Sequence, residues 1–213
     1  MTGLLNAPVP DVPSVPSAPD LRSAPSAPSV LDAHSAPDSQ HRYQVRFDVG
    51  LDGARRVGES AHVLIWCDGI VTEPLPVDAL PPHLEIIDAR YAAVAVIAER
   101  VLAVQAERGE RTMVAVIAAG SPVDSPGGIP VEDQLLAGAV IDALGAVGVD
   151  ATSPEAAVAA AAFQGLRAAV GHLLTASVGG RELAAAEPGA MNRARSRWES
   201  AELVVVRRFN LPA

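Results

Sequence analysis

Three acidic residues stand where the sequence pattern places the end of a strand and the start of a helix. Asp68 directly follows an apolar run of strand length, and the pair Glu132 and Asp133 opens an amphipathic stretch after a segment rich in glycine and proline. Carboxylate oxygens are the hard ligands that Mg²⁺ prefers. These residues therefore predict a metal-assisted phosphate site, although the helix dipole alone also favours acids in a first helical turn, and Asp-Gly is ordinary turn chemistry.

Two glycine-containing segments could supply backbone N–H groups to an anion. The first runs from Gly120 to Pro130 and includes Gly127 and Gly128. The second is Ser177-Val-Gly-Gly-Arg181, in which Gly179, Gly180 and the Arg181 guanidinium could bind an oxyanion together. The alternative for the second segment is a helix C-cap at Gly179 or Gly180, followed by a helix with exposed charges.

Several other chemistries are excluded by residue type. All 16 basic residues are arginine, which excludes a Walker lysine, a Schiff-base lysine and a lysine general base. The five histidines show no i,i+4 pairing, and the single cysteine, Cys67, cannot form an internal disulfide. A zinc site and a nucleophilic triad are therefore not expected.

The elements that must position the acidic residues alternate along the chain. Short, continuous apolar runs predict buried strands, and stretches with apolar residues three and four apart predict amphipathic helices. Strands are expected at 43–47, 62–67, 84–87, 113–118 and 203–206, and helices at 50–56, 90–108, 132–147, 154–173, 181–186 and 191–198. This alternation predicts a three-layer α/β/α domain with a mostly parallel sheet, whose ligands bind at the carboxyl ends of the strands.

The first 41 residues have a different composition from the rest. They repeat Ser-Ala-Pro, contain no aromatic residue and hold 8 of the 18 prolines before residue 40. Such a segment cannot bury enough apolar surface to offset its conformational entropy. We therefore expect a disordered tail over 1–41 and an α/β domain over 42–213.

Charge and hydropathy restrict the partners. The formal net charge of −9 opposes binding to nucleic acid or anionic lipid, and the one basic cluster, Arg193, Arg195 and Arg197, is small. We expect charged residues, at Glu99-Arg100 and Asp142, to interrupt the longest apolar stretches before they reach the length of about 20 residues that crosses a bilayer. With a single cysteine and no signal peptide pattern, we expect a cytoplasmic protein without a membrane partner.

Three stretches of the chain resemble the 2-phosphosulfolactate phosphatase family. They are 45–54 with the strand leading to Asp68, 114–120 with the Glu-Asp block at 131–139, and 153–156 followed by Phe163 and Ser-x-Gly-Gly-Arg-Glu-Leu at 177–183. The resemblance implies a Mg²⁺-dependent hydrolase that removes phosphate from a small phosphorylated or sulfonated acid.

The resemblance also implies roles for particular residues. Asp68 with Glu132 or Asp133 would hold Mg²⁺, with Asp48 as a further ligand or a partner to one, and Glu132 and Asp133 would be catalytic. Ser177, Gly179, Gly180, Arg181 and the amides of Gly127 and Gly128 would bind the substrate oxyanions.

The chain departs from the family between its first and second matched stretches. A short proline-rich bridge replaces a longer section, and the family's Pro-Asn-Gly loop is absent. This departure supports an alternative: a catalytically inactive relative that serves as a small-anion binding or interaction module. An apolar face left exposed by the shortening would favour a homo-oligomer.

Overall fold

The computed structural model describes residues 39–70, 74–91, 93–120, 130–198 and 201–208. The chain divides into two units, 1–36 and 37–213, and the second unit contains all the described residues. The predicted disordered tail therefore lies outside the described residues, except for 39–41. Those three belong to a turn at 39–42, two residues before the first strand.

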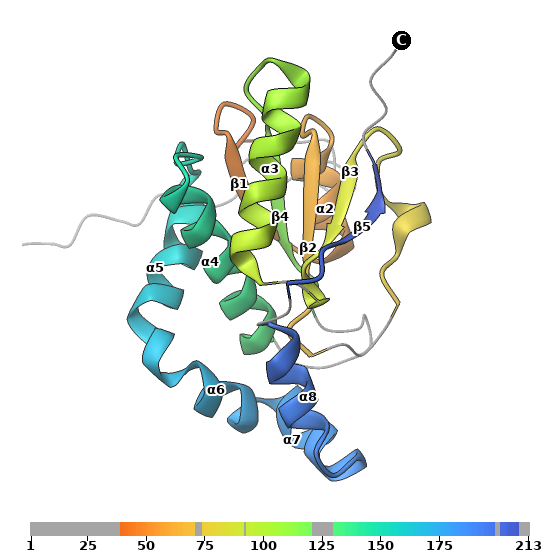
Figure 1. The fold of residues 1–213 in the computed structure, drawn as a ribbon, viewed down its shortest axis with the longest axis vertical. Coiled ribbons are helices and arrows are strands. Elements are labelled where there is room, and N and C mark those ends of the chain that lie inside the picture. Colours follow the sequence, from red (N-terminus) through yellow and green to blue (C-terminus); the bar gives the residue numbers. More distant parts are fainter. Residues whose placement is uncertain (1–38, 71–73, 92, 121–129, 199–200, 209–213) are drawn as a thin grey trace, which may run out of the picture. The chain divides into compact units, whose positions relative to one another are not determined.

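Five strands form one mixed sheet, as Figure 1 shows. The strand order is β1 (Val45–Val49), β4 (Val114–Ala118), β2 (Val63–Cys67), β3 (Glu85–Asp88) and β5 (Val204–Arg207). The first four are parallel, and β5 is antiparallel to β3. The predicted α/β class with a mostly parallel sheet is confirmed. The carboxyl ends of the four parallel strands lie together at one end of the sheet, the carboxyl edge, where Val49, Ala118 and Cys67 are in register.

Helices cover both faces of this sheet because side chains alternate along each strand. On one face, Val45, Phe47 and their counterparts on the other strands pack against α3 (Val94–Arg108), α4 (Val131–Ala146) and α5 (Pro154–Leu166). On the other face, Leu64, Trp66 and Ile117 pack against α2 (Gly50–Gly58). Short 3₁₀ helices lie at Val77–Ala79 (η2) and Ala89–Tyr91 (η3).

The single helix expected over 154–173 is divided in the structure. It comprises α5, a 3₁₀ turn η4 (Arg167–Ala169) and α6 (Val170–Ala176), followed by α7 (Val178–Ala186) and α8 (Ala190–Arg197). Ser153 caps α5 as predicted, because its hydroxyl accepts the Ala156 N–H at 3.1 Å. Gly179 and Gly180 belong to the first turn of α7, capped by Ser177, and not to the end of a preceding helix.

The helices α6, α7 and α8 lie beside the carboxyl edge of the sheet (Figure 1). A small apolar cluster of Ile70, Leu174 and Met191 joins them to the turn that follows β2. The Trp198 indole N–H also donates to the Gly69 carbonyl at 3.3 Å. The chain after α5 is thus fixed to the residues that immediately follow Asp68.

One apolar run is longer than the sequence analysis expected. Residues 154–176, which span α5 to α6, are long and apolar enough to cross a membrane by length and composition, with a mean hydropathy of 1.3 in their most apolar window. Only 11% of that window is buried. The expectation that charge interrupts every such run overlooked this one, because Glu155 and Arg167 are its only acidic or arginine residues.

Candidate functional site

The turn after β2 and the first turn of α4 bring three of the predicted acidic residues to the carboxyl edge. Asp68, Glu132 and Asp133 are 6%, 5% and 3% exposed. Gly69 makes this approach possible, since a Cβ on it would lie 2.9 Å from Cβ of Glu132 and 2.6 Å from its carbonyl oxygen. A glycine at position 69 therefore allows the strand-end turn to lie directly against the helix.

Asp133 links the ends of two strands. Its carboxylate accepts the Gly69 N–H at 2.8 Å, after β2, and the Gly120 N–H at 3.0 Å, after β4. Burial raises the pKa of Asp133 to about 8, the charge of Asp68 adds to the rise, and the two amide hydrogen bonds oppose it. The higher pKa favours the uncharged form of this carboxyl group, and its two hydrogen bonds hold the turns after β2 and β4.

Among the buried carboxylates of the described residues, Glu132 has an oxygen without a hydrogen-bond partner. Its Oε2 is buried and accepts no hydrogen bond from the described residues. A Cβ on Gly179 would collide with its Oε1, so the first turn of α7 lies directly against this carboxylate. A buried, unpartnered carboxylate oxygen is costly, and a bound cation or donor would offset that cost.

A buried arginine that the sequence analysis missed lies at the same edge. Arg90, in η3, is 8% exposed, and its Nε donates to the two Asp88 carboxylate oxygens at 2.7 and 2.8 Å. Its Nη1 lies 3.9 Å from Oδ2 of Asp68. The available signal is Ile-Ile-Asp-Ala-Arg at 86–90, a strand end with two charges, but the apolar run alone predicts a strand that ends at Ile87.

The structure does not bring Asp48 to this group. Val45 and Phe47 face α4 and α5, so the alternation along β1 turns Asp48 toward α2 on the opposite face. There its Oδ2 accepts from Arg56 at 2.9 and 3.0 Å. The interpretation of Asp48 as a metal ligand overlooked this alternation.

Of the predicted substrate-binding residues, Gly179 lies against Glu132, as described above. The Ser177 hydroxyl accepts the Gly180 N–H at 3.0 Å and donates to the Leu174 carbonyl, so it serves as a helix cap. Arg181 is exposed and donates to the Ala176 carbonyl, so its guanidinium does not join the acidic group. Gly127 and Gly128 lie outside the described residues.

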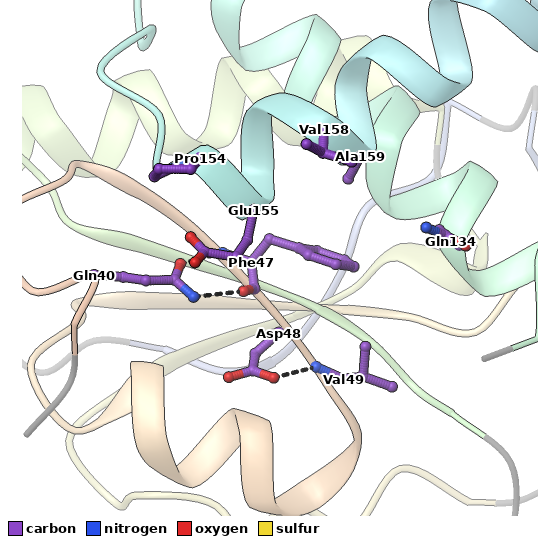
Figure 2. Close-up of a pocket in the computed structure, with 9 residues that line it drawn as sticks. All are labelled: Gln40, Phe47, Asp48, Val49, Gln134, Pro154, Glu155, Val158 and Ala159. Atoms are coloured by element: carbon purple, nitrogen blue, oxygen red, sulfur yellow. Dashed lines mark hydrogen bonds between the residues drawn. The ribbon is translucent and has the colours of Figure 1, made fainter. Parts of the chain in front are cut away.

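A separate pocket of about 550 Å³ lies on the outer side of β1. Figure 2 shows Phe47, Asp48 and Val49 following one another along its floor, with Val158 and Ala159 of α5 above them. Gln40 closes the strand edge beside it, because its amide donates to the Phe47 carbonyl at 2.9 Å and accepts the Phe47 N–H at 3.0 Å. The lining is mainly apolar and holds no basic side chain among the described residues.

Within the described residues, no group of three or more histidine, cysteine, aspartate or glutamate side chains is arranged to hold a metal ion. Mg²⁺ commonly binds one or two carboxylates, and water and phosphate oxygens complete its shell. Glu132, with its unpartnered oxygen, is one candidate carboxylate for such a site, and Asp68, which precedes the Gly69 that lies against Glu132, is the other. Cys67 is not a candidate nucleophile, because burial raises the pKa of its thiol well above the ordinary value.

No family model, curated protein or solved structure matches this chain. The family resemblance of the three sequence stretches therefore stays a prediction from motifs.

Proposed function

We propose that this protein is a Mg²⁺-dependent phosphatase acting on a small phosphorylated organic acid such as 2-phosphosulfolactate. The observation that carries the proposal is the Glu132 carboxylate, which is buried at the carboxyl edge with an oxygen that accepts no hydrogen bond from the described residues. Its acidic neighbours make the local charge negative, and a phosphate would be repelled without a cation. The motif resemblance supports the same reaction.

The proposed site assigns separate roles to its residues. Glu132 and Asp68 would hold Mg²⁺, which supplies charge neutralisation and orientation of the phosphoryl group when bound. Asp133 holds the turns after β2 and β4 in place through Gly69 and Gly120. Arg90 lies near Asp68 and adds a fixed positive charge beside the carboxylates.

The proposal is tested by calorimetric titration of Mg²⁺ into the full chain, together with release of phosphate from 2-phosphosulfolactate. Glu132→Gln preserves shape but removes the charge, so we expect Mg²⁺ affinity to fall at least tenfold and turnover to be lost. Glu182→Gln, on the exposed surface of α7, is the matched control and should leave both unchanged. Full Mg²⁺-dependent activity in the Glu132 variant would show that the assignment is wrong.

A second candidate is a catalytically inactive module that binds a small anion together with the cation. Two observations favour it: no three-ligand group occurs in the described part of the chain, and Arg181 is turned away from the acidic group. The same titration separates the candidates when phosphate or sulfolactate is added with Mg²⁺. Binding heat without phosphate release supports the module, whereas binding with release supports the enzyme.

A further inference from the structure

Gly179 is a glycine for which the backbone of α7 gives no reason. It lies in the first turn of this helix, and its φ is outside the left-handed region that favours glycine. In a helical turn, glycine is less stable than alanine because it loses more conformational freedom on folding. The reason for a glycine at this position therefore lies in the residues around it.

The residue that leaves no room for a side chain at position 179 is Glu132. A Cβ on Gly179 would collide with Oε1 of Glu132, whereas the next nearest atoms are at ordinary contact distances: Cδ of Glu132 at 3.6 Å and Cδ1 of Ile70 at 3.9 Å. The collision thus involves the end of a side chain and no backbone atom. A methyl group at position 179 would therefore displace the Glu132 carboxylate, and the backbone of α7 could stay where it is.

Two other glycines near this site have a different reason for being glycine. A Cβ on Gly180 would collide with the backbone carbonyl of Leu174, and a Cβ on Gly69 would lie 2.6 Å from the backbone carbonyl oxygen of Glu132. A side chain at either position would force the main chain to move, so these two glycines are required for packing of the backbone. Gly179 differs from both, because its close contact is with a carboxylate oxygen.

The first turn of α7 is fixed next to this carboxylate. The Ser177 hydroxyl accepts the Gly180 N–H at 3.0 Å and so caps the helix. Further along α7, Leu183 packs against the apolar cluster that contains Ile70, which follows β2. The helix is therefore held at its start and along its length, and Oε1 of Glu132 lies against a turn that does not easily give way.

We propose that Gly179 is a positioning residue for Glu132 and acts through the absence of a side chain. Because α7 can lie directly against Oε1, the planar carboxylate is held with its other oxygen, Oε2, buried and without a hydrogen bond from the described residues. The inference rests on the proposed function, in which this carboxylate holds Mg²⁺. It differs from the role that the family resemblance implies, since Gly179 acts on the cation ligand and not on the substrate oxyanions.

Calorimetric titration of Mg²⁺ into the full chain carrying Gly179→Ala tests the proposal, with thermal unfolding measured beside it. We expect the Mg²⁺ affinity to fall at least tenfold while the melting temperature stays close to that of the unsubstituted chain. Gly165→Ala is the matched control, because a Cβ at this exposed position of α5 meets no atom within 4 Å, and it should leave the affinity unchanged. A melting temperature lowered as far as in Gly180→Ala would show that Gly179 serves packing alone and would overturn the proposal.

A second substitution tests whether the effect passes through Glu132. Glu132→Asp shortens the side chain by one methylene group and removes the collision, so adding Gly179→Ala to this variant should change the Mg²⁺ affinity less than twofold. An equal loss from Gly179→Ala in both backgrounds would contradict the positioning role. Unchanged affinity in Gly179→Ala alone would also overturn it but leave the proposed function intact, whereas absence of Mg²⁺ binding by the unsubstituted chain would overturn both.

Discussion

The buried carboxylates at the carboxyl edge differ in what satisfies them. Asp133 accepts two backbone N–H groups, Asp88 accepts from Arg90, and Glu132 has an oxygen that no described residue satisfies. A buried carboxylate is stable only when its charge is paired, hydrogen-bonded or removed by a proton. Asp133 is thus hydrogen-bonded and Asp88 is paired with a guanidinium. Of the three residues, only Glu132 has a buried oxygen that an added ligand would satisfy.

The raised pKa of Asp133 gives the protein a predictable pH dependence. The folded-state pKa of about 8 lies above the ordinary value of 3.8, so between these values the folded state binds the extra proton. Stability should therefore fall as pH rises through this window, by up to about 1.4 kcal/mol per pH unit, and this decline should end above about pH 8. Urea denaturation from pH 5 to 9 without divalent cations measures the slope.

Asp133→Asn is the variant that isolates this contribution. An amide cannot ionise, so the decline in unfolding free energy between pH 5 and 8 should become shallower. The same amide presents a donor to one of the two glycine N–H groups, so at pH 5 we expect a loss of about 1 to 3 kcal/mol. An unchanged slope in this variant would mean that another group titrates.

Arg90 is expected to be required for stability as well as for charge. Arg90→Met leaves the buried Asp88 carboxylate without its guanidinium, which should cost about 3 to 5 kcal/mol of unfolding free energy. Adding Asp88→Leu removes the orphaned charge and should recover much of that loss. Guanidinium denaturation of the two variants measures the difference. If the single and double variants are equally unstable, the loss comes from packing and not from the unpaired charge.

The sequence analysis located Asp68, Glu132 and Asp133 because each stands at the end of a strand or the start of a helix. It did not locate Arg90, since the partner of a buried charge depends on a turn geometry that residue types do not specify. The direction of Asp48 was predictable from the alternation of Val45 and Phe47. The unpartnered oxygen of Glu132 was not predictable from the sequence, because it depends on the position of α7.

The apolar runs of the sequence were sufficient to predict the order of the strands and helices. The four parallel strands and α3, α4 and α8 lie within a few residues of their predicted ranges. Two features were not accessible: the antiparallel direction of β5, and the 3₁₀ turn that separates α5 from α6. Both depend on contacts between distant segments, such as the bond from Arg207 Nε to the Leu84 carbonyl at 2.9 Å.

The packing of α4 on α5 predicts opposite effects for two glycines of the same helix. A Cβ on Gly138 would lie 2.8 Å from Cβ of Phe163 and collide with the Ala159 carbonyl, so Gly138→Ala should cost about 1 to 3 kcal/mol. Gly145 has open space around it, so Gly145→Ala should stabilise α4 by about 0.5 to 1 kcal/mol. Thermal unfolding compares the two. Equal effects would contradict the close approach of these helices.

At the scale of the whole domain, the sheet has two outer strands, β1 and β5, whose backbone groups have no further strand to pair with. On the β3 side of β5, Arg207 donates to carbonyls of the loop before β3, which fixes β5 to the sheet. At the β1 edge, Val45 accepts the Ser153 N–H at 2.8 Å, and further along the strand Gln40 pairs with both backbone groups of Phe47. An unpaired strand edge can associate with another chain, so the Gln40 side chain protects the sheet as well as stabilising it.

The β1 edge also predicts where the N-terminus can be shortened. Removing residues 1–38 retains Gln40 and should leave the unfolding free energy unchanged within about 0.5 kcal/mol, as expected for a segment whose composition predicts disorder. Removing 1–42 deletes the two Gln40 bonds to Phe47 and the His41 carbonyl that accepts from Arg46 at 2.7 Å. Loss of the bonds to Phe47 and Arg46 alone should cost about 3 kcal/mol and expose the strand edge to aggregation. Urea denaturation with light scattering measures both effects, and Gln40→Ala in the full chain separates the side-chain contribution. If the two truncations are equally stable, the closure of this edge by Gln40 has no energetic weight.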